Sequence, residues 1–201
     1  MPGRTTQPIN VAAIPHIREL LEDRPRDYAL FVIGLNTGLR AGDLCRLRLG
    51  DFITARAKFR ATLRVKTRKR NRWVEVAINS RIRSAVYKWM QDNPRAKCDS
   101  FLFYSTTRGY GKNYEAHITP SHVSRLVRAW CESVGEFGHA AHSLRKTRAA
   151  TLYRAAAQEI GPEEAILVAA KTLGHKSIKT TADYLGMSRE KMLSWQAKVG
   201  L

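Results

Sequence analysis

The chain has 201 residues, of which 44% are apolar, a composition typical of one domain with a hydrophobic core and unlike that of a disordered chain. No apolar run approaches the roughly 18 residues of a membrane span, and the N-terminus lacks the apolar segment of a signal peptide. We therefore expect a cytoplasmic protein, in which Cys45, Cys98 and Cys131 are reduced thiols because they form no CxxC pattern.

The net charge of +18, from 35 Lys and Arg against 17 Asp and Glu, is the most informative bulk property. A charge this far from neutrality repels itself, and a polyanionic partner is the usual reason for it. No basic amphipathic helix stands apart from the core pattern, so nucleic acid is favoured over an anionic membrane.

Apolar residues at helical spacing predict two N-terminal helices, Val11–Leu21 and Arg26–Leu35, the second ended by an Asn-Thr-Gly turn. A short third helix is expected from about Ala41.

The segment 56–72 carries nine basic residues and no acidic one. Apolar and basic positions alternate along it with the period of a strand, and the apolar set continues in 73–78, which predicts a hairpin with one packed and one cationic face. Such a run is usually a solvated face, but a row of one sign along a strand and its turn is suited to following phosphates. DNA contacts are expected from Lys58, Arg60, Arg64, Arg68, Lys69 and Arg72.

Helical spacing dominates the rest of the chain. Helices are expected over 80–93, 119–135, 142–160, 161–174 and 188–199. Residues 100–115 are predicted to be loop, with a short buried strand at 101–104. The expected fold is mainly α-helical with a small three-stranded antiparallel β-sheet.

Four separated motifs could carry chemistry, although each alone has an ordinary structural explanation. A surface ion pair would explain Arg40 with Asp43, and a place in the hydrophobic core would explain Tyr184. The motifs contain Arg40 with Asp43, Lys66, His142 with Arg145, and His175 with Tyr184 nine residues later.

Together these residues favour phosphodiester chemistry. Two guanidiniums can neutralise both non-bridging oxygens of a phosphodiester, and a phenol can be a covalent nucleophile if neighbours assist its ionisation. His139 and His142 are three residues apart, but further metal ligands are absent nearby, so no metal is expected. Without a Gly-rich phosphate loop or a carboxylate cluster for Mg²⁺, no cofactor is expected either.

Four stretches resemble the motifs of the tyrosine recombinases, the phage-integrase-like family. They are TGLRAGDLCRLRLGD, VKTRKRNRWVEV, HSLRKT and LGHKSIKTTADYL, and the resemblance spans about Ile9 to Ser188. It implies the fold of this family's catalytic domain and a metal-independent, site-specific DNA recombinase that works through a 3′-phosphotyrosyl intermediate.

The resemblance also implies a role for each residue. Arg40 and Arg145 would clamp the scissile phosphate, with His142 as acid/base and His175 as a hydrogen-bond donor. Lys66 would protonate the leaving 5′-oxygen, with Lys69 as the alternative in the same turn. Tyr184 would be the nucleophile, and Lys176 would contact DNA. Asp43 would orient neighbouring groups, where the family more often has Glu.

The implied domain organisation is a tail at 1–10 and a single catalytic domain at 11–201, without the N-terminal core-binding domain usual in this family. The chain would then be a fragment, or a short form like the fimbrial-switch invertases or minimal phage integrases. The partners would be double-stranded DNA in the nucleoid and three further copies of the chain on synapsed DNA, with a monomer in solution. The helix at 188–201 would contact a neighbouring protomer or fold back on its own chain.

Two alternatives stay open from the sequence. A type IB topoisomerase shares this chemistry but relaxes supercoils without a target site. A non-catalytic DNA-binding relative would keep the charge without the reaction.

Overall fold

The computed structural model describes residues 6–68, 71–107, 111–173 and 181. The chain divides into two compact units, Met1–Thr147 and Arg148–Leu201. Helix α6 (Ala141–Ile160) begins in the first unit and continues into the second. Among the described residues, no helix is long and apolar enough to cross a membrane.

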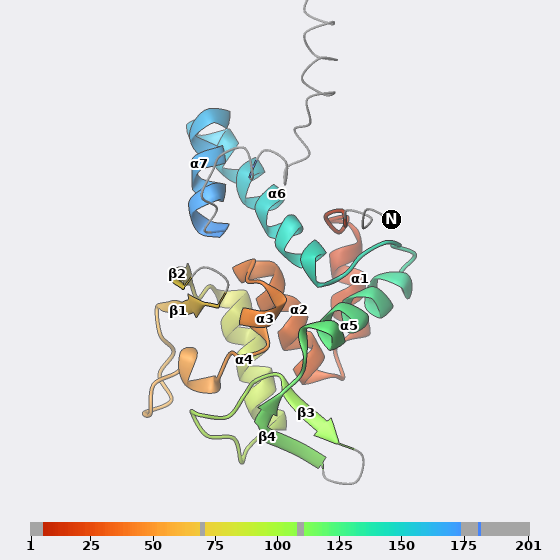
Figure 1. The fold of residues 1–201 in the computed structure, drawn as a ribbon, viewed down its shortest axis with the longest axis vertical. Coiled ribbons are helices and arrows are strands. Elements are labelled where there is room, and N and C mark those ends of the chain that lie inside the picture. Colours follow the sequence, from red (N-terminus) through yellow and green to blue (C-terminus); the bar gives the residue numbers. More distant parts are fainter. Residues whose placement is uncertain (1–5, 69–70, 108–110, 174–180, 182–201) are drawn as a thin grey trace, which may run out of the picture. The chain divides into compact units, whose positions relative to one another are not determined.

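The first unit is mainly helical, with two short β-hairpins (Figure 1). Its elements before α6 are α1 (Ala13–Leu20), α2 (Pro25–Thr37), α3 (Ala41–Leu44), the 3₁₀ turn η1 (Leu49–Asp51), β1 (Thr62–Thr67), β2 (Arg72–Ala77), α4 (Ser80–Asp92), β3 (Tyr104–Thr107), β4 (Gly111–His117) and α5 (Pro120–Glu132).

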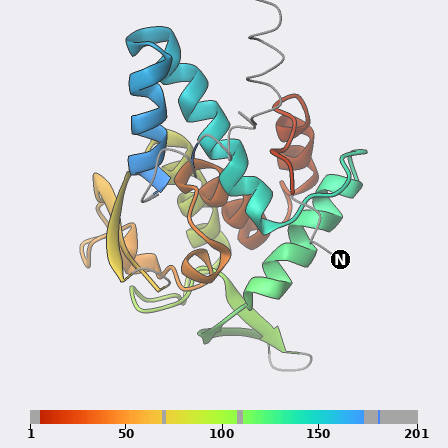
Figure 2. The same ribbon diagram turned by 45° about the horizontal axis from the view of Figure 1, so that its top comes forward.

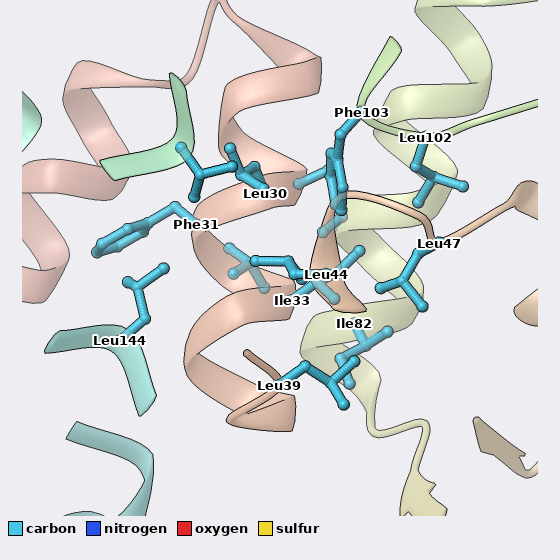
Figure 3. Close-up of a cluster of buried hydrophobic side chains, with 14 of the residues drawn as sticks. Leu30, Phe31, Ile33, Leu39, Leu44, Leu47, Ile82, Leu102, Phe103 and Leu144 are labelled. Carbon is cyan, nitrogen blue, oxygen red and sulfur yellow. The ribbon is translucent and has the colours of Figure 1, made fainter. Parts of the chain in front are cut away.

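Helix α2 is the centre of this unit because it is apolar on nearly all sides, the pattern of a buried helix. It starts with Pro25 at its first position and ends at Gly38, whose φ of 63° is the left-handed conformation that glycine adopts without strain. It packs against α4, and Leu30 and Ile33 lie in the hydrophobic core (Figure 3). The sequence-based prediction of this helix is confirmed.

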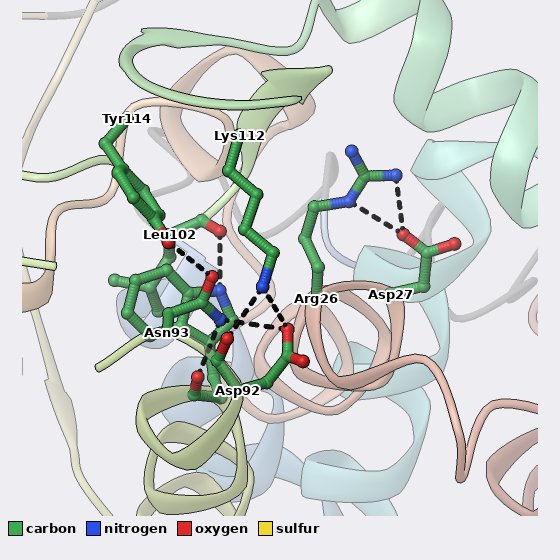
Figure 4. Close-up of polar contacts among 8 residues, drawn as sticks. Arg26, Asp27, Asp92, Asn93, Leu102, Lys112 and Tyr114 are labelled. Carbon is green, nitrogen blue, oxygen red and sulfur yellow. Dashed lines mark hydrogen bonds and ion pairs between the residues drawn. The ribbon is translucent and has the colours of Figure 1, made fainter. Parts of the chain in front are cut away.

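Helix α4 joins the core to the loop that precedes β3. Asn79 caps its N-terminus by accepting a hydrogen bond from the Ile82 backbone N–H at 3.0 Å. The fully buried Trp89 donates its indole N–H to the carbonyl oxygen of Leu102 at 2.9 Å. The carboxyl end of α4 also holds the second hairpin, because Lys112 binds Asp92 (Figure 4).

Strands β1 and β2 form the predicted antiparallel hairpin (Figure 2), and their side chains alternate as expected between a buried and an exposed face. Leu63 and Thr67 of β1 and Val76 of β2 are buried. On the opposite face, Arg64 and Lys66 are exposed. One face of the hairpin therefore packs while the other presents cations to solvent, as the period of two requires.

The strand count differs from the expected one. The described residues contain two separate two-stranded sheets, β1–β2 and β3–β4, in place of one three-stranded sheet. The second hairpin occupies much of the segment 100–115 that was predicted to be loop. Only Tyr104 of the predicted strand 101–104 belongs to it. The helix predicted from Ala41 is a single turn.

The N-terminal segment before α1 takes part in the packing of the first unit. Ile9 is buried, and its backbone N–H donates to the hydroxyl of Thr147 at 2.8 Å. This bond ties the beginning of the chain to the first turns of α6.

The second unit contains the remainder of α6 and helix α7 (Pro162–Leu173). Gly161, with a φ of 83°, separates the two helices. Pro162 opens α7, and Glu163 and Glu164 follow in its first turn, where the helix dipole favours negative charge. The predicted boundary near 161 is confirmed. The helix predicted at 188–199 lies outside the described residues.

Trp89→Ala should lower the free energy of unfolding by about 3–5 kcal/mol, because it removes a fully buried ring and leaves a cavity. Tyr87→Ala, on the exposed side of the same helix, is the matched control and should change stability by less than about 1 kcal/mol. Urea unfolding of both variants measures the difference. Equal losses would contradict the assignment of Trp89 to the core.

Candidate functional site

Arg40 lies in the turn between α2 and α3. Gly38 reverses the chain in a left-handed conformation, and Leu39 is buried as an anchor. Arg40 is then extended, with φ −68° and ψ 149°, and occupies the N-cap position of α3. Its side chain is thereby presented from a turn fixed on both sides by the core.

Arg145 approaches the same turn from α6. It is 3% exposed, and its Nη1 donates to the carbonyl oxygen of Gly38 at 2.6 Å. The approach of α6 depends on Gly34, where an added Cβ would lie 2.7 Å from Cδ1 of Leu144. Leu144 lies in the hydrophobic core (Figure 3), and its packing therefore sets the position of the next residue, Arg145.

His142 precedes Arg145 by one helical turn and is exposed. Partial desolvation lowers the pKa of its imidazole below the usual 6.5, and the positive charges of Arg145, Lys146 and Arg40 lower it further. The imidazole is therefore neutral at neutral pH and lies near the positive charges of these side chains.

Asp43 connects this region to the cationic hairpin. The carboxylate is 4% exposed and accepts hydrogen bonds from the Arg68 backbone N–H at 2.9 Å and from Nη2 of Arg46 at 3.2 Å. It therefore pairs with Arg46, in contrast to the surface pair with Arg40 that the spacing alone suggested. Because Arg68 follows the end of β1, Asp43 holds the strand that carries Lys66 against α3.

Lys66 is exposed and borders a shallow hollow of about 400 Å³. The hollow is also lined by Asp43, Arg46 and Arg64, and by Trp73 of the neighbouring strand. A second hollow, of about 490 Å³, shares Arg64 with the first. The two hollows therefore lie next to each other along the basic side chains of Arg60, Arg64 and Lys66.

The residues predicted to contact DNA are solvent-accessible wherever the structure describes them. The side chains of Lys58, Arg60, Arg64, Arg68 and Arg72 are all exposed. Only some are held in place: Nε of Arg60 donates to the carbonyl oxygen of Gly50 at 2.9 Å, and Arg64 lies over the ring of Trp73 at 5.5 Å. Lys69, His175, Lys176 and Tyr184 lie outside the described residues.

The structure adds residues that the sequence pattern did not single out. Lys146 is buried, and burial lowers the pKa of its ammonium. Arg46 and Trp73 line the hollow beside Lys66. The position of Lys146 directly after Arg145 was a usable signal, whereas nothing in the local sequence indicated that Arg46 would bind Asp43. Within the described ranges, no three His, Cys, Asp or Glu side chains form a metal site.

The phage integrase family model matches residues 7–191. The chain belongs to this family. It is 30% identical over 166 residues to y4gC of Sinorhizobium fredii, a protein named as an integrase/recombinase, with 82% of this chain and 78% of that protein covered.

Solved recombinases share the fold. XerA recombinase matches 98% of this chain with a TM-score of 0.69 and 20% identity, and a XerH post-cleavage complex matches 98% with 0.69 and 19%. A lambda integrase dimer on a core site matches 90% with 0.62 and 18%. The chain spans 65%, 54% and 49% of the lengths of these proteins. The expected tyrosine recombinase catalytic-domain fold is confirmed.

Asp43→Ala should raise the hydrogen-exchange rate of the Arg68 amide about tenfold, because the N–H loses a charged acceptor worth roughly 1.5 kcal/mol. Asp43→Asn keeps one acceptor oxygen, so its Arg68 amide should exchange at a rate between those of Asp43→Ala and the wild type. Amide exchange followed by NMR measures both. Asp92→Ala, which removes a carboxylate from the other hairpin, is the control. An unchanged Arg68 rate in Asp43→Ala would show that Asp43 does not hold the end of β1.

Proposed function

We propose that this member of the phage integrase family is a site-specific DNA recombinase that cleaves and rejoins strands through a 3′-phosphotyrosyl intermediate. The observation that carries the proposal is the convergence of Arg40, His142 and Arg145 at the α2–α3 turn. Arg40 lies more than 100 positions before His142 and Arg145 in the chain, and the fold brings these three cationic or ionisable groups together.

The first role of the site is to bind a phosphodiester. The guanidiniums of Arg40 and Arg145 hold its non-bridging oxygens with charge-assisted hydrogen bonds. Arg145 is already fixed by Gly38, so its donors need little reorganisation as negative charge grows in the pentacoordinate transition state. The cations of the protein supply electrostatic stabilisation at these oxygens.

The second role is proton transfer. The phenol oxygen of Tyr184 attacks phosphorus, and its proton passes to His142, whose lowered pKa keeps the imidazole neutral and able to accept at neutral pH. The bond from phosphorus to the 5′-oxygen breaks, and Lys66 donates a proton to that oxygen. In the reverse step the neutral amine takes the proton back from the attacking 5′-hydroxyl, so the phosphodiester reforms without an external energy source.

The roles of His175 and Tyr184 rest on their sequence motif, since both lie outside the described residues. His175 donates a further hydrogen bond to the phosphate, and Tyr184 is the nucleophile. The assignment of Lys66 as the acid draws on its exposed position on β1, next to the strand end that Asp43 holds.

Double-stranded DNA is the proposed partner. The net charge of +18 and the exposed cations of β1 support this proposal, as do the XerH and lambda integrase structures, which contain their DNA sites. A lambda integrase tetramer on a Holliday junction is also among the similar structures. We propose the same stoichiometry, four copies on two synapsed duplexes, for strand exchange by this chain.

Tyr184→Phe should abolish covalent capture of a suicide substrate nicked next to the cleavage site, since only the phenol oxygen can form the phosphotyrosyl bond. Denaturing gel electrophoresis detects the covalent complex. Tyr153→Phe is the control and should leave capture unchanged. Capture that persists in Tyr184→Phe and disappears in Tyr153→Phe would reassign the nucleophile. Relaxation of plasmids that lack any target site would favour the type IB topoisomerase alternative.

Reversing the charges of Lys58, Arg60 and Arg64 should weaken DNA binding and reduce the slope of log affinity against log salt by about three, because each phosphate contact releases counterions. Fluorescence anisotropy at several salt concentrations measures the slope. Reversal of Arg81, Arg95 and Lys97, three exposed cations of α4 and the loop after it, changes net charge equally and serves as control. Equal effects of the two triple variants would show that net charge, not the positions of Lys58, Arg60 and Arg64, determines binding.

A further inference from the structure

We propose that Trp73 is a positioning residue that holds the side chain of Lys66 for proton transfer to the leaving 5′-oxygen. The inference deepens the proposed function and rests on it, because it assigns a partner to the proposed general acid. It concerns a tryptophan on the solvent face of the hairpin, a position where the fold itself requires no aromatic ring.

The strand register places the two residues directly opposite each other. Lys66 of β1 pairs with Trp73 of β2 in the antiparallel ladder. Opposed residues lie on the same face of a sheet, with Cβ atoms about 4.5–5.5 Å apart. The indole and the aliphatic stem of the lysine are therefore neighbours, and both border the hollow of about 400 Å³ that reaches Asp43.

The exposure of Trp73 indicates that packing of the core does not explain it. Its side chain is 63% exposed, whereas Trp89 and Trp130 are buried. The ring instead lies between two cationic side chains of this face, with Arg64 5.5 Å from its centroid and Lys66 opposite it, and an indole attracts such cations through its π face. The face is ordered around it, since Arg64 lies over the indole at 5.5 Å and Thr62 donates to Glu75 at 2.7 Å.

A lysine that acts as a general acid needs its side chain to be held in a limited range of orientations. Its ammonium is a compact charge on a stem of four carbons with many rotamers, and efficient proton transfer requires it within hydrogen-bond reach of one oxygen. Arg64 occupies one side of the indole and Lys66 stands across from it. The ring thus limits the directions that the lysine stem can take, while like-charge repulsion keeps Arg64 and Lys66 apart.

The test separates positioning from DNA contact by changing the leaving atom. A 5′-bridging sulfur in place of oxygen leaves as a thiolate, whose conjugate acid has a pKa of about 8.5, and it does not need a proton. Single-turnover cleavage rates are measured with oxygen and sulfur suicide substrates for the wild type, Lys66→Ala, Trp73→Ala and Trp73→Phe, with DNA affinity measured in parallel.

We expect Trp73→Ala to slow cleavage of the oxygen substrate about tenfold to a hundredfold. Loss of positioning removes only part of the rate acceleration that a general acid typically contributes. The sulfur substrate should be cleaved within about threefold of the wild-type rate. Trp73→Phe keeps a flat ring and should recover most of the oxygen rate. Glu75→Ala, on the same face and strand, is the matched control and should slow both substrates equally or neither.

Other outcomes would overturn the inference. An equal loss on oxygen and sulfur substrates in Trp73→Ala, with weaker binding, would make Trp73 a DNA contact. If Lys66→Ala is rescued by sulfur and Trp73→Ala is not, the positioning role fails while the proposed function stands. If sulfur does not rescue Lys66→Ala, the assignment of the acid fails as well. Absence of any covalent complex in the wild type would overturn the proposed function itself.

Discussion

The hydrogen bond from Arg145 to the carbonyl oxygen of Gly38 is the contact on which the candidate site depends. A charged donor contributes about 1.5–3 kcal/mol in such a bond, and loss of the acceptor would remove this contribution from a buried guanidinium. Both partners are positioned by the core, because Gly38 ends the central helix α2 and Leu144 packs beside Gly34. The stability of the fold and the geometry of the arginines proposed to bind phosphate therefore share one contact.

Electrostatic repulsion is the cost of this arrangement. Desolvation lowers the pKa of His142, and the charges of Arg145, Lys146 and Arg40 lower it further, so the folded state opposes protonation of the imidazole. The pKa of His142 is lower folded than unfolded, so the protein loses stability as pH falls through about 6.5, the unfolded value. In the proposed function, the negative charge of a bound phosphodiester offsets part of this repulsion. Such concentration of unfavourable charge is typical of functional sites.

The fold was largely predictable because its elements have clear local signals. Helix α2 has an apolar sequence with a proline start and a glycine end, and β1 alternates strictly. The hairpin of β3 and β4 was missed because Ser105–Thr107 and most of β4 are polar, so no apolar alternation marks them. Its order comes from contacts with the end of α4, such as the bond from Tyr114 to Asn93 at 2.9 Å (Figure 4). Packing between distant segments is not visible in a periodicity.

The candidate site also combines residues that have a local sequence signal with contacts that have none. Arg40, His142 and Arg145 could be named because their residue types occur in recognisable motifs, but the partner of Asp43 could not. Its main acceptor role is toward a backbone N–H 25 residues away, and every residue except proline offers that group. In the proposed reaction, Asp43 therefore acts through geometry. It fixes the end of β1 to helix α3, which directly follows Arg40, so the proposed acid and the proposed phosphate clamp belong to one rigid frame instead of two independent loops.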